Sequence, residues 1–546
     1  MATVTPYSNL SALIIDDMAT QQSTLRGHLN LLGISKVEMV STPEDALRNL
    51  RGKRYNLVLC DYNLNAKTDG QQLFEYARDN QLLPPDTLFF MITAESTYAS
   101  VASATEQHPD AYLLKPITAT DIEERLKVML DKRDALLAIH TKLSKDDLVG
   151  ALAECDAVLA QKNRWTMSAM QTKGSVLLKL GRHEEAKAIY RAALDVRSDL
   201  TWARLGLARA HKAAGQYQEA QMLARDIIES RDGDKNVAAY DVIAESLEAL
   251  GDPEGAMWVL RDAAQVVPSA RRQRLLGESA YRNGDLDTAK DALGKATKSS
   301  KGSVMAQPQD TLLLAQTMVD MGAPSDALKV LQEGQTAFRN SPGFDNVALA
   351  VQAQAEVGTG AAEQALKTVA RARETMRKGK ADFATVALAK AEIMTGNEDA
   401  GFKLLESAIS ADHENLRIKQ MISKALRDTG HEDKIESVIE SAAAGLQSKV
   451  SDARKLLRDS KIDDAVAMIE AAVREYPENT GVLLQAAQIN CMALRLKKDL
   501  DATRIERIRT YLTRLEKLLP GHDRVNTMRR YFRETLGLLE ATSLQD

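Results

Sequence analysis

Side chains that can bind a metal ion or a phosphoryl group stand at the ends of short apolar runs near the start of the chain: Asp16, Asp17, Asp61, Thr93 and Lys115. The runs before them have the length and composition of buried parallel strands. Ligands of open α/β sheets gather outside the carboxyl ends of such strands. We therefore expect three acids, one hydroxyl and one amine at one edge of a sheet, as a divalent-metal and phosphoryl site.

The chemistry of such a site follows from charge. A carboxylate attacks phosphorus poorly while like charges surround it, because the anionic donor is repelled. A Mg²⁺ ion held by oxygen ligands neutralises that charge and clamps the transferred oxygens. The ammonium group of Lys115 then balances an acyl phosphate, and the small side chain of Ala94 leaves room for it. No separate base is needed, since a carboxylate is already ionised at neutral pH.

The elements that position these residues alternate between short apolar runs and helical patterns, as in a parallel sheet with helical crossovers. The predicted strands are Ala12–Ile15, Lys36–Val40, Leu57–Cys60, Leu88–Ile92 and Ala111–Leu114. The predicted helices between them are Thr20–Leu32, Pro43–Arg51, Gly70–Asn80 and Thr97–Gln107. This order predicts a small, doubly wound α/β sheet, followed by a fifth helix after Pro116.

From about residue 118 the strand pattern gives way to a helical pattern that repeats. A turn glycine followed five residues later by a small anchor residue recurs along the chain. The anchors are Ala186, Ala220, Ala256, Ala289 and Ala327, with looser copies at Ala365, Gly401, Ile435 and Ala465. Their successive spacings are 34, 36, 33, 38, 38, 36, 34 and 30 residues. This pattern resembles the tetratricopeptide repeat, a helix–turn–helix unit of about 34 residues, and predicts an all-α solenoid.

Other small residues keep the same register. Gly174 and Gly277 precede their anchors by twelve residues, where the two helices of a repeat approach each other. Pro268 and Pro477 follow their anchors by twelve and end the second helix. The register therefore supports the repeat assignment at several positions of each unit.

Composition excludes several classes of function. The 546 residues carry a net charge of −5 and a pI near 6.0, which gives no electrostatic case for nucleic acid or an anionic membrane. Three distant cysteines form no disulfide framework or metal motif. No signal peptide and no apolar run of about 18 residues is evident, so we expect no membrane insertion and a cytoplasmic protein.

Residues 9–132 resemble the receiver domain of two-component response regulators. The resemblance rests on Asp16-Asp17, Asp61, Thr93-Ala94 and Lys115-Pro116, which fall in order at the expected strand ends. It implies a flavodoxin-like five-stranded parallel sheet in which Asp61 accepts the phosphoryl group. The implied Mg²⁺ ligands are Asp17 and Asp61 directly, Asp16 through water, and the backbone carbonyl of Asn63.

The same resemblance assigns the residues around the phosphoryl group. Thr93 would donate a hydrogen bond to it, Ala94 would leave it space, and Lys115 would neutralise it. Thr93 and Tyr112 would form the conformational switch, in which Tyr112 changes rotamer. In one departure, receivers usually have a methionine–proline pair and then a glycine eight residues after the acceptor. Here Gly70 stands nine residues after Asp61 and no proline intervenes, so the loop is remodelled.

These patterns predict four segments. They are a receiver at 1–132, a linker helix with a degenerate first repeat at 133–165, a repeat array at 166–480 and capping helices at 481–546.

Output is expected from binding, because stacked helical repeats offer a long concave surface and no chemistry. Arg209, Lys212, Arg271 and Arg274 project toward the predicted groove, either to clamp an acidic peptide or as a solvated face. We expect no enzyme activity beyond Mg²⁺-dependent self-phosphorylation and autodephosphorylation at Asp61.

Three functions are compatible with these residues. The main interpretation is a response regulator that a sensor histidine kinase phosphorylates at Asp61, and whose array engages an unidentified protein target. The second is a phosphorelay modulator that docks on a sensor kinase and inhibits or diverts phosphotransfer. The third is a constitutive scaffold in which a non-switching receiver serves as a dimerisation module, giving a homodimer.

Overall fold

The computed structural model describes residues 7–543, except for 67, 85, 95–108, 146, 231–232, 304–305, 340, 342–343, 376–381, 413–414 and 519–522; the side chains of 440–448, 523 and 540–543 are also left aside. The predicted helix Thr97–Gln107 lies outside the described residues. The chain divides into two compact units. The first comprises Met1–Leu178, Arg182–Leu276 and Lys295–Gln307, and the second Lys179–Gly181, Gly277–Gly294 and Pro308–Asp546.

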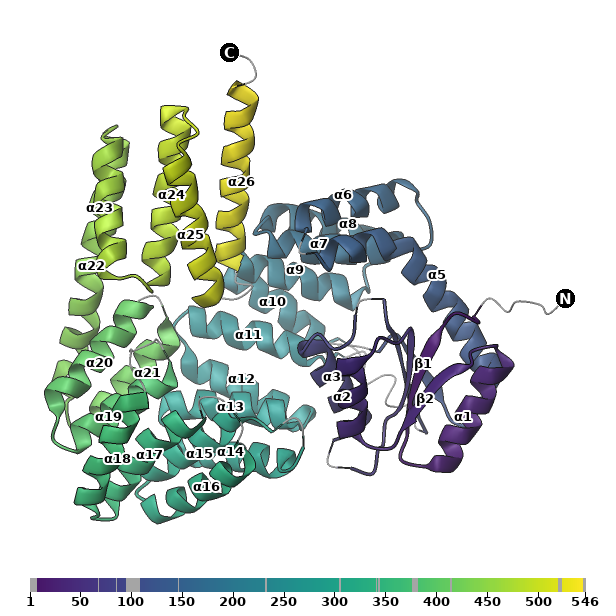
Figure 1. Cartoon of the computed structure of the whole chain (residues 1–546), viewed down its shortest axis with the longest axis horizontal. Helices are drawn as coiled ribbons and strands as arrows, with labels where there is room; N and C mark the ends of the chain where they lie inside the picture. The colour runs from purple at the N-terminus through teal and green to yellow at the C-terminus, as the bar shows by residue number, and fades with distance from the viewer. Residues whose placement is uncertain are drawn as a thin grey trace. The chain divides into compact units, whose positions relative to one another are not determined.

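Five parallel strands form one sheet in the order β2-β1-β3-β4-β5. They are β1 (Ser11–Ile15), β2 (Lys36–Val40), β3 (Leu57–Asp61), β4 (Leu88–Thr93) and β5 (Ala111–Leu114). The predicted flavodoxin-like sheet is confirmed, and each predicted strand agrees with the observed one to within a residue. Figure 1 shows this sheet beside its helices at the purple end of the chain.

Alternate residues of the strands pack against helices on opposite faces. Leu13 and Ile15 of β1 join a core with α2 (Pro43–Gly52) and α3 (Gly70–Asp79). Ala12 and Ile14 join a core with α1 (Ala19–Leu31) and α5 (Ala119–Leu143). Both faces of the sheet are therefore apolar, and polar side chains at strand ends are confined to the sheet edge.

Helix α5 follows the last strand of the sheet and continues as one unbroken helix past the predicted segment boundary at residue 132. Its second half packs Leu136 and Ile139 against Ala151 and Cys155 of α6 (Leu148–Ala160). The segment boundaries themselves remain a prediction.

Beyond β5 every described element is helical, as predicted. None of these described helices is long and apolar enough to cross a membrane. The helices are α7 (Thr166–Lys179), α8 (His183–Val196), α9 (Thr201–Ala213), α10 (Tyr217–Ile228), α11 (Val237–Ala249), α12 (Pro253–Val266), α13 (Ala270–Asn283), α14 (Leu286–Ser300), α15 (Pro308–Asp320), α16 (Pro324–Ala337), α17 (Phe344–Gly358), α18 (Ala362–Thr375), α19 (Phe383–Met394), α20 (Glu398–Ala411), α21 (Leu416–Asp428), the 3₁₀ turn η1 (Glu432–Lys434), α22 (Ile435–Arg458), α23 (Ile462–Glu475), α24 (Thr480–Lys497), α25 (Ala502–Leu518) and α26 (Asp523–Ser543).

The turn between the two helices of each repeat uses a left-handed backbone. Glycines hold this conformation at 181, 215, 251, 284, 322, 360, 396 and 430, with φ between 67° and 88°. Glycine adopts it without the clash that a Cβ causes. Ser460 takes the same place in the last repeat with φ 60°. The turns therefore recur with the spacing that the sequence predicts.

Small residues let the two helices of a repeat approach closely. A Cβ on Gly174 would lie 2.5 Å from the ring of Tyr190, and one on Gly277 would lie 2.6 Å from Cγ of Leu293. The anchor Ala186 is also fully buried. The predicted close approach is confirmed, because only glycine fits at these positions.

One repeat departs from the pattern. Its anchor, Ile435, is only half-buried, and α22 runs on from there as a single helix to Arg458. Alanines follow Ile435 in the sequence, with no proline, so helix propensity favours continuing the helix rather than a turn.

Replacing Ser460 by glycine should stabilise the protein by about 1 kcal/mol, because a residue with a Cβ pays that cost in the left-handed region. Urea unfolding of the full chain should show a higher midpoint. Ser460→Ala keeps the Cβ and serves as the matched control. An equal rise in both variants would mean that loss of the hydroxyl, and not relief of the backbone, is responsible.

Buried charges connect repeats within the second unit. Lys390 of α19 donates to Asp320 of α15 at 2.7 Å and to Asp428 of α21 at 2.5 Å. Lys424 of α21 donates to the same two acids, at 3.1 and 2.7 Å. Tyr281 of α13 adds a hydrogen bond to Asp320 at 2.9 Å. Burial alone would raise the pKa of Asp320, but the two ammonium groups outweigh burial and hold it below its ordinary value.

Candidate functional site

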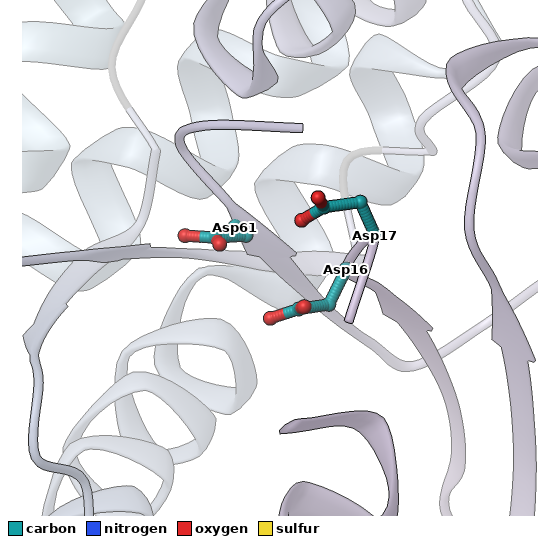
Figure 2. A group of neighbouring side chains, drawn as sticks. All are labelled: Asp16, Asp17 and Asp61. Carbon is teal, nitrogen blue, oxygen red and sulfur yellow. The ribbon is translucent and has the colours of Figure 1, made fainter. Parts of the chain in front are cut away.

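Three carboxylates meet at the carboxyl ends of neighbouring strands. Asp16 and Asp17 directly follow β1, and Asp61 ends β3, its neighbour in the sheet. One ligand oxygen from each lies within 4.8 Å of the others. Figure 2 shows the three side chains together at these strand ends. The structure thus brings together the acids that the sequence predicts for the site.

Asp16 is the most deeply buried of the three acids. Its side chain is 0% exposed, and Oδ1 accepts a hydrogen bond from the amide of Met18 at 2.9 Å. Oδ2 has no hydrogen-bond partner among the described residues. Burial raises the pKa of Asp16, as do the nearby carboxylates of Asp61 and Asp17. A buried oxygen without a hydrogen-bond donor, in a set of hard oxygen ligands, fits a small divalent cation.

Lys115 supplies the positive charge of the site. It follows β5, and its Nζ donates to Oδ2 of Asp61 at 2.8 Å. The same nitrogen lies 3.9 Å from Oδ2 of Asp16. Asp61 itself is 6% exposed. The lysine therefore partly balances the negative charge of these acids.

Thr93 and Tyr112 lie on the next two strands. Ile92 of β4 pairs in register with Asp61, so Thr93, the last residue of β4, and Ala94 after it stand just beyond Asp61. Thr93 is buried and Ala94 exposed. Tyr112 of β5 is half-buried, and burial is the main cause of its raised pKa. The register brings these residues to the same edge of the sheet as Asp61, and their roles remain a prediction.

Asn63 lies two residues after Asp61. It is exposed, and its Oδ1 accepts a hydrogen bond from the amide of Asn65 at 3.1 Å. This side-chain bond shapes the loop, and the role of the backbone carbonyl of Asn63 as a metal ligand remains a prediction.

Gln22 is a positioning residue that the sequence does not reveal. Its Nε2 on α1 donates to the carbonyl of Asp16 at 2.6 Å, to that of Val40 at 3.1 Å and to Oγ of Ser41 at 2.9 Å. It therefore ties the acidic loop after β1 to the end of β2. A lone glutamine in an amphipathic helix carries no periodic signal of this role.

Gly70 lies directly against the backbone of Asp61. A Cβ on Gly70 would stand 2.2 Å from the backbone oxygen of Asp61 and 3.0 Å from Sδ of Met91. Any larger residue at the start of α3 would therefore push the backbone at the end of β3 out of its observed position.

Replacing Gly70 by alanine should destabilise the protein by about 1–3 kcal/mol, the usual cost of overpacking, and slow phosphorylation of Asp61. Thermal unfolding and labelling by acetyl phosphate measure the two effects. Gly27→Ala is the control, because no atom lies within 4 Å of a Cβ on this exposed helical residue. The control should be neutral or stabilising, and equal behaviour of both variants would contradict the contact.

The residues predicted for the groove lie on first helices of repeats, Arg209 and Lys212 on α9, Arg271 and Arg274 on α13. Lys212 forms an ion pair with Glu245 of α11 in the next repeat. Part of this positive charge is therefore compensated within the array, and recognition of an acidic peptide by the four residues remains a prediction.

Two family models match this chain. Residues 12–127 match the response regulator receiver domain, and residues 177–240 match the tetratricopeptide repeat. Chemotaxis protein CheY-3 of Vibrio cholerae is 26% identical over 124 residues, which cover 23% of this chain and 94% of the relative. Chemotaxis protein CheY of Pseudomonas aeruginosa is 24% identical over 123 residues, 22% of this chain and 98% of the relative.

Among solved structures, a tetratricopeptide repeat protein from Parabacteroides merdae is 14% identical. The match covers 51% of this chain and 98% of that protein, with a TM-score of 0.31.

Proposed function

We propose that the protein is a phospho-acceptor response regulator whose output is protein–protein interaction through its repeat array. A sensor histidine kinase supplies the phosphoryl group, and Asp61 accepts it. The observation that carries this proposal is the 2.8 Å contact between Nζ of Lys115 and Asp61, beside the acids Asp16 and Asp17. An attacking oxygen, a charge-balancing amine and two further oxygen ligands are what transfer to a carboxylate requires.

The acids are suited to hold Mg²⁺. Asp17 and Asp61 would hold it directly, Asp16 would hold it through water, and the backbone carbonyl of Asn63 would complete the protein ligands. When bound, the ion neutralises the charge on the transferred oxygens. Its positive charge would also stabilise the Asp16 carboxylate, which burial deprives of water and which the carboxylates of Asp61 and Asp17 repel.

Transfer is a displacement at phosphorus. A carboxylate oxygen of Asp61 forms the new P–O bond as the P–N bond of a phosphohistidine breaks, and the imidazole leaves with the bonding electron pair and takes up a proton. Lys115 then pairs with the acyl phosphate, while Thr93 donates a hydrogen bond and Ala94 leaves the space open. Attack of water on phosphorus reverses the modification and releases inorganic phosphate.

The signal is a change of local charge. Phosphorylation adds about −1.5 to −2 charge and three strong acceptors to the end of β3. Thr93 is drawn toward the phosphoryl group, and Tyr112 turns into the space beside it. A nearly complete switch requires that phosphorylation favour one conformation by about 5 kcal/mol over the other.

The test is a pull-down from lysate of the source cell with the full-length protein as bait. Beryllofluoride with Mg²⁺ imitates the phosphoryl group, and an Asp61→Asn bait is the control. A partner whose recovery changes with beryllofluoride only on the wild-type bait supports the proposal. Equal recovery under all conditions contradicts it and favours a constitutive scaffold. Recovery of a sensor kinase that then transfers less phosphate to other regulators favours a phosphorelay modulator.

A further inference from the structure

The remodelled stretch after Asp61 contacts the array inside the first compact unit. Thr68 lies seven residues after Asp61, just before α3, and is 1% exposed. Its hydroxyl stands 2.7 Å from the hydroxyl of Ser303, in the turn after α14. Two segments 235 residues apart in sequence are thus joined by a hydrogen bond. The loop that departs from the family pattern therefore contacts the repeats.

A second link lies further along α3. Glu75 is half-buried, and its carboxylate accepts a hydrogen bond from Nε2 of Gln71 at 3.0 Å. Burial is the largest influence on Glu75 and raises its pKa, while the positive charge of Arg271 on α13 acts in the opposite direction. Arg271 is therefore near enough to Glu75 for their charges to attract, which adds to the contact that Thr68 makes.

Hydrogen bonds also join the segment Thr68–Glu75 to residues beside the candidate phosphorylation site. The amide of Gly70 donates to the carbonyl of Tyr62 at 2.7 Å, which ties the start of α3 to the residue after Asp61. The hydroxyl of Tyr112 donates to Oε1 of Gln71 in a long hydrogen bond of 3.4 Å. Tyr62, the residue after Asp61, and Tyr112 are thus hydrogen-bonded to the segment that touches the array.

We infer that residues Thr68–Glu75 form an internal docking surface that holds the array against the receiver, and that phosphorylation of Asp61 weakens it. The inference rests on the proposed function. When Tyr112 turns toward Thr93 it gives up its bond to Gln71, whose amide orients Glu75. The added negative charge at the end of β3 also acts on the backbone that carries Gly70 and Thr68. Repeat residues near Ser303 are then released to meet a partner.

Linkage makes this inference quantitative. If phosphorylation weakens the docking contact by some factor, a substitution that breaks the contact must strengthen binding of the phosphoryl mimic, by up to that same factor. A contact that serves only stability would not show this reciprocity.

The experiment uses full-length protein carrying Ser303→Lys, which places a long side chain opposite Thr68. Ser299→Lys is the matched control, because Ser299 is exposed and bonds only to the carbonyl of Ala296 in its own helix. Thr68→Val, which replaces the hydroxyl by a methyl group, is the reciprocal variant. Fluorine NMR measures the affinity for beryllofluoride with Mg²⁺, and hydrogen exchange follows the amides of 299–303 and 60–66.

We expect beryllofluoride to speed exchange at 299–303 by about tenfold in wild type and in Ser299→Lys. In Ser303→Lys and Thr68→Val exchange there should already be fast, and beryllofluoride should bind more tightly. Beryllofluoride binding with protection of 60–66 but no change at 299–303 would overturn the inference and leave the proposed function standing. Absence of any beryllofluoride binding to wild type would overturn both.

Discussion

Replacing Asp61 by asparagine should abolish Mg²⁺-dependent phosphorylation of the full-length protein. The amide has the size of the carboxylate but neither its charge nor its nucleophilic oxygen, so no acyl phosphate can form. Removal of Mg²⁺ by EDTA should give the same loss in wild type, and added Mg²⁺ should restore labelling. Incorporation of phosphate from radiolabelled acetyl phosphate measures both effects.

Asp134→Asn is the control for this loss. Asp134 is an exposed acid on α5 that pairs only with the neighbouring Arg133, so its substitution should leave labelling unchanged. Lys115→Met should reduce the rate by about 100- to 1,000-fold, as removal of one charge-stabilising group commonly does. Persistent labelling of Asp61→Asn would show that another residue accepts the phosphoryl group.

Replacing Asp320 by alanine should destabilise the second unit by about 3–5 kcal/mol. The substitution leaves Lys390 and Lys424 with only Asp428 between them, and an uncompensated charge in the interior is costly. Urea unfolding of the full chain, followed by circular dichroism, should show a transition at lower urea. Asp326→Ala removes an exposed acid paired with Lys329 and should leave the curve unchanged. Similar curves for the two variants would mean that the buried pairs contribute no net stability.

The pH dependence of this effect has a defined sign. The folded-state pKa of Asp320 lies below its ordinary value of 3.8. Its contribution is therefore fully present above that ordinary value and is lost as the pH falls through the lowered folded-state pKa. The difference in unfolding free energy between wild type and Asp320→Asn should be constant near neutral pH and shrink below about pH 4. A difference that grew on acidification would contradict the assignment.

Local patterns predict much of the fold and of the site. Asp61 and Lys115 could be placed from sequence because each ends a recognisable strand, and the parallel register brings strand ends together. Gly174 could be placed because the repeat fixes which residue faces its partner helix. In each case the position follows from a period that a single segment displays.

Contacts that depend on distant segments could not be predicted in this way. Gln22 acts through the ends of two strands, and nothing in its own helix indicates it. Asp320 and Lys424 stand 104 residues apart. A repeat period says which face a residue occupies, but the rotation from one repeat to the next decides which residues meet across several repeats.

The buried charges change the order in which we expect the repeats to unfold. In a simple solenoid each repeat touches only its neighbours, so unfolding can begin at an end and proceed one unit at a time. Here Asp320 of α15 is bonded to lysines of α19 and α21, which belong to later repeats. None of α15, α19 and α21 can then unfold alone without leaving an unbalanced charge on the others. This part of the chain should behave as one cooperative block, and fraying should be confined to the repeats outside it.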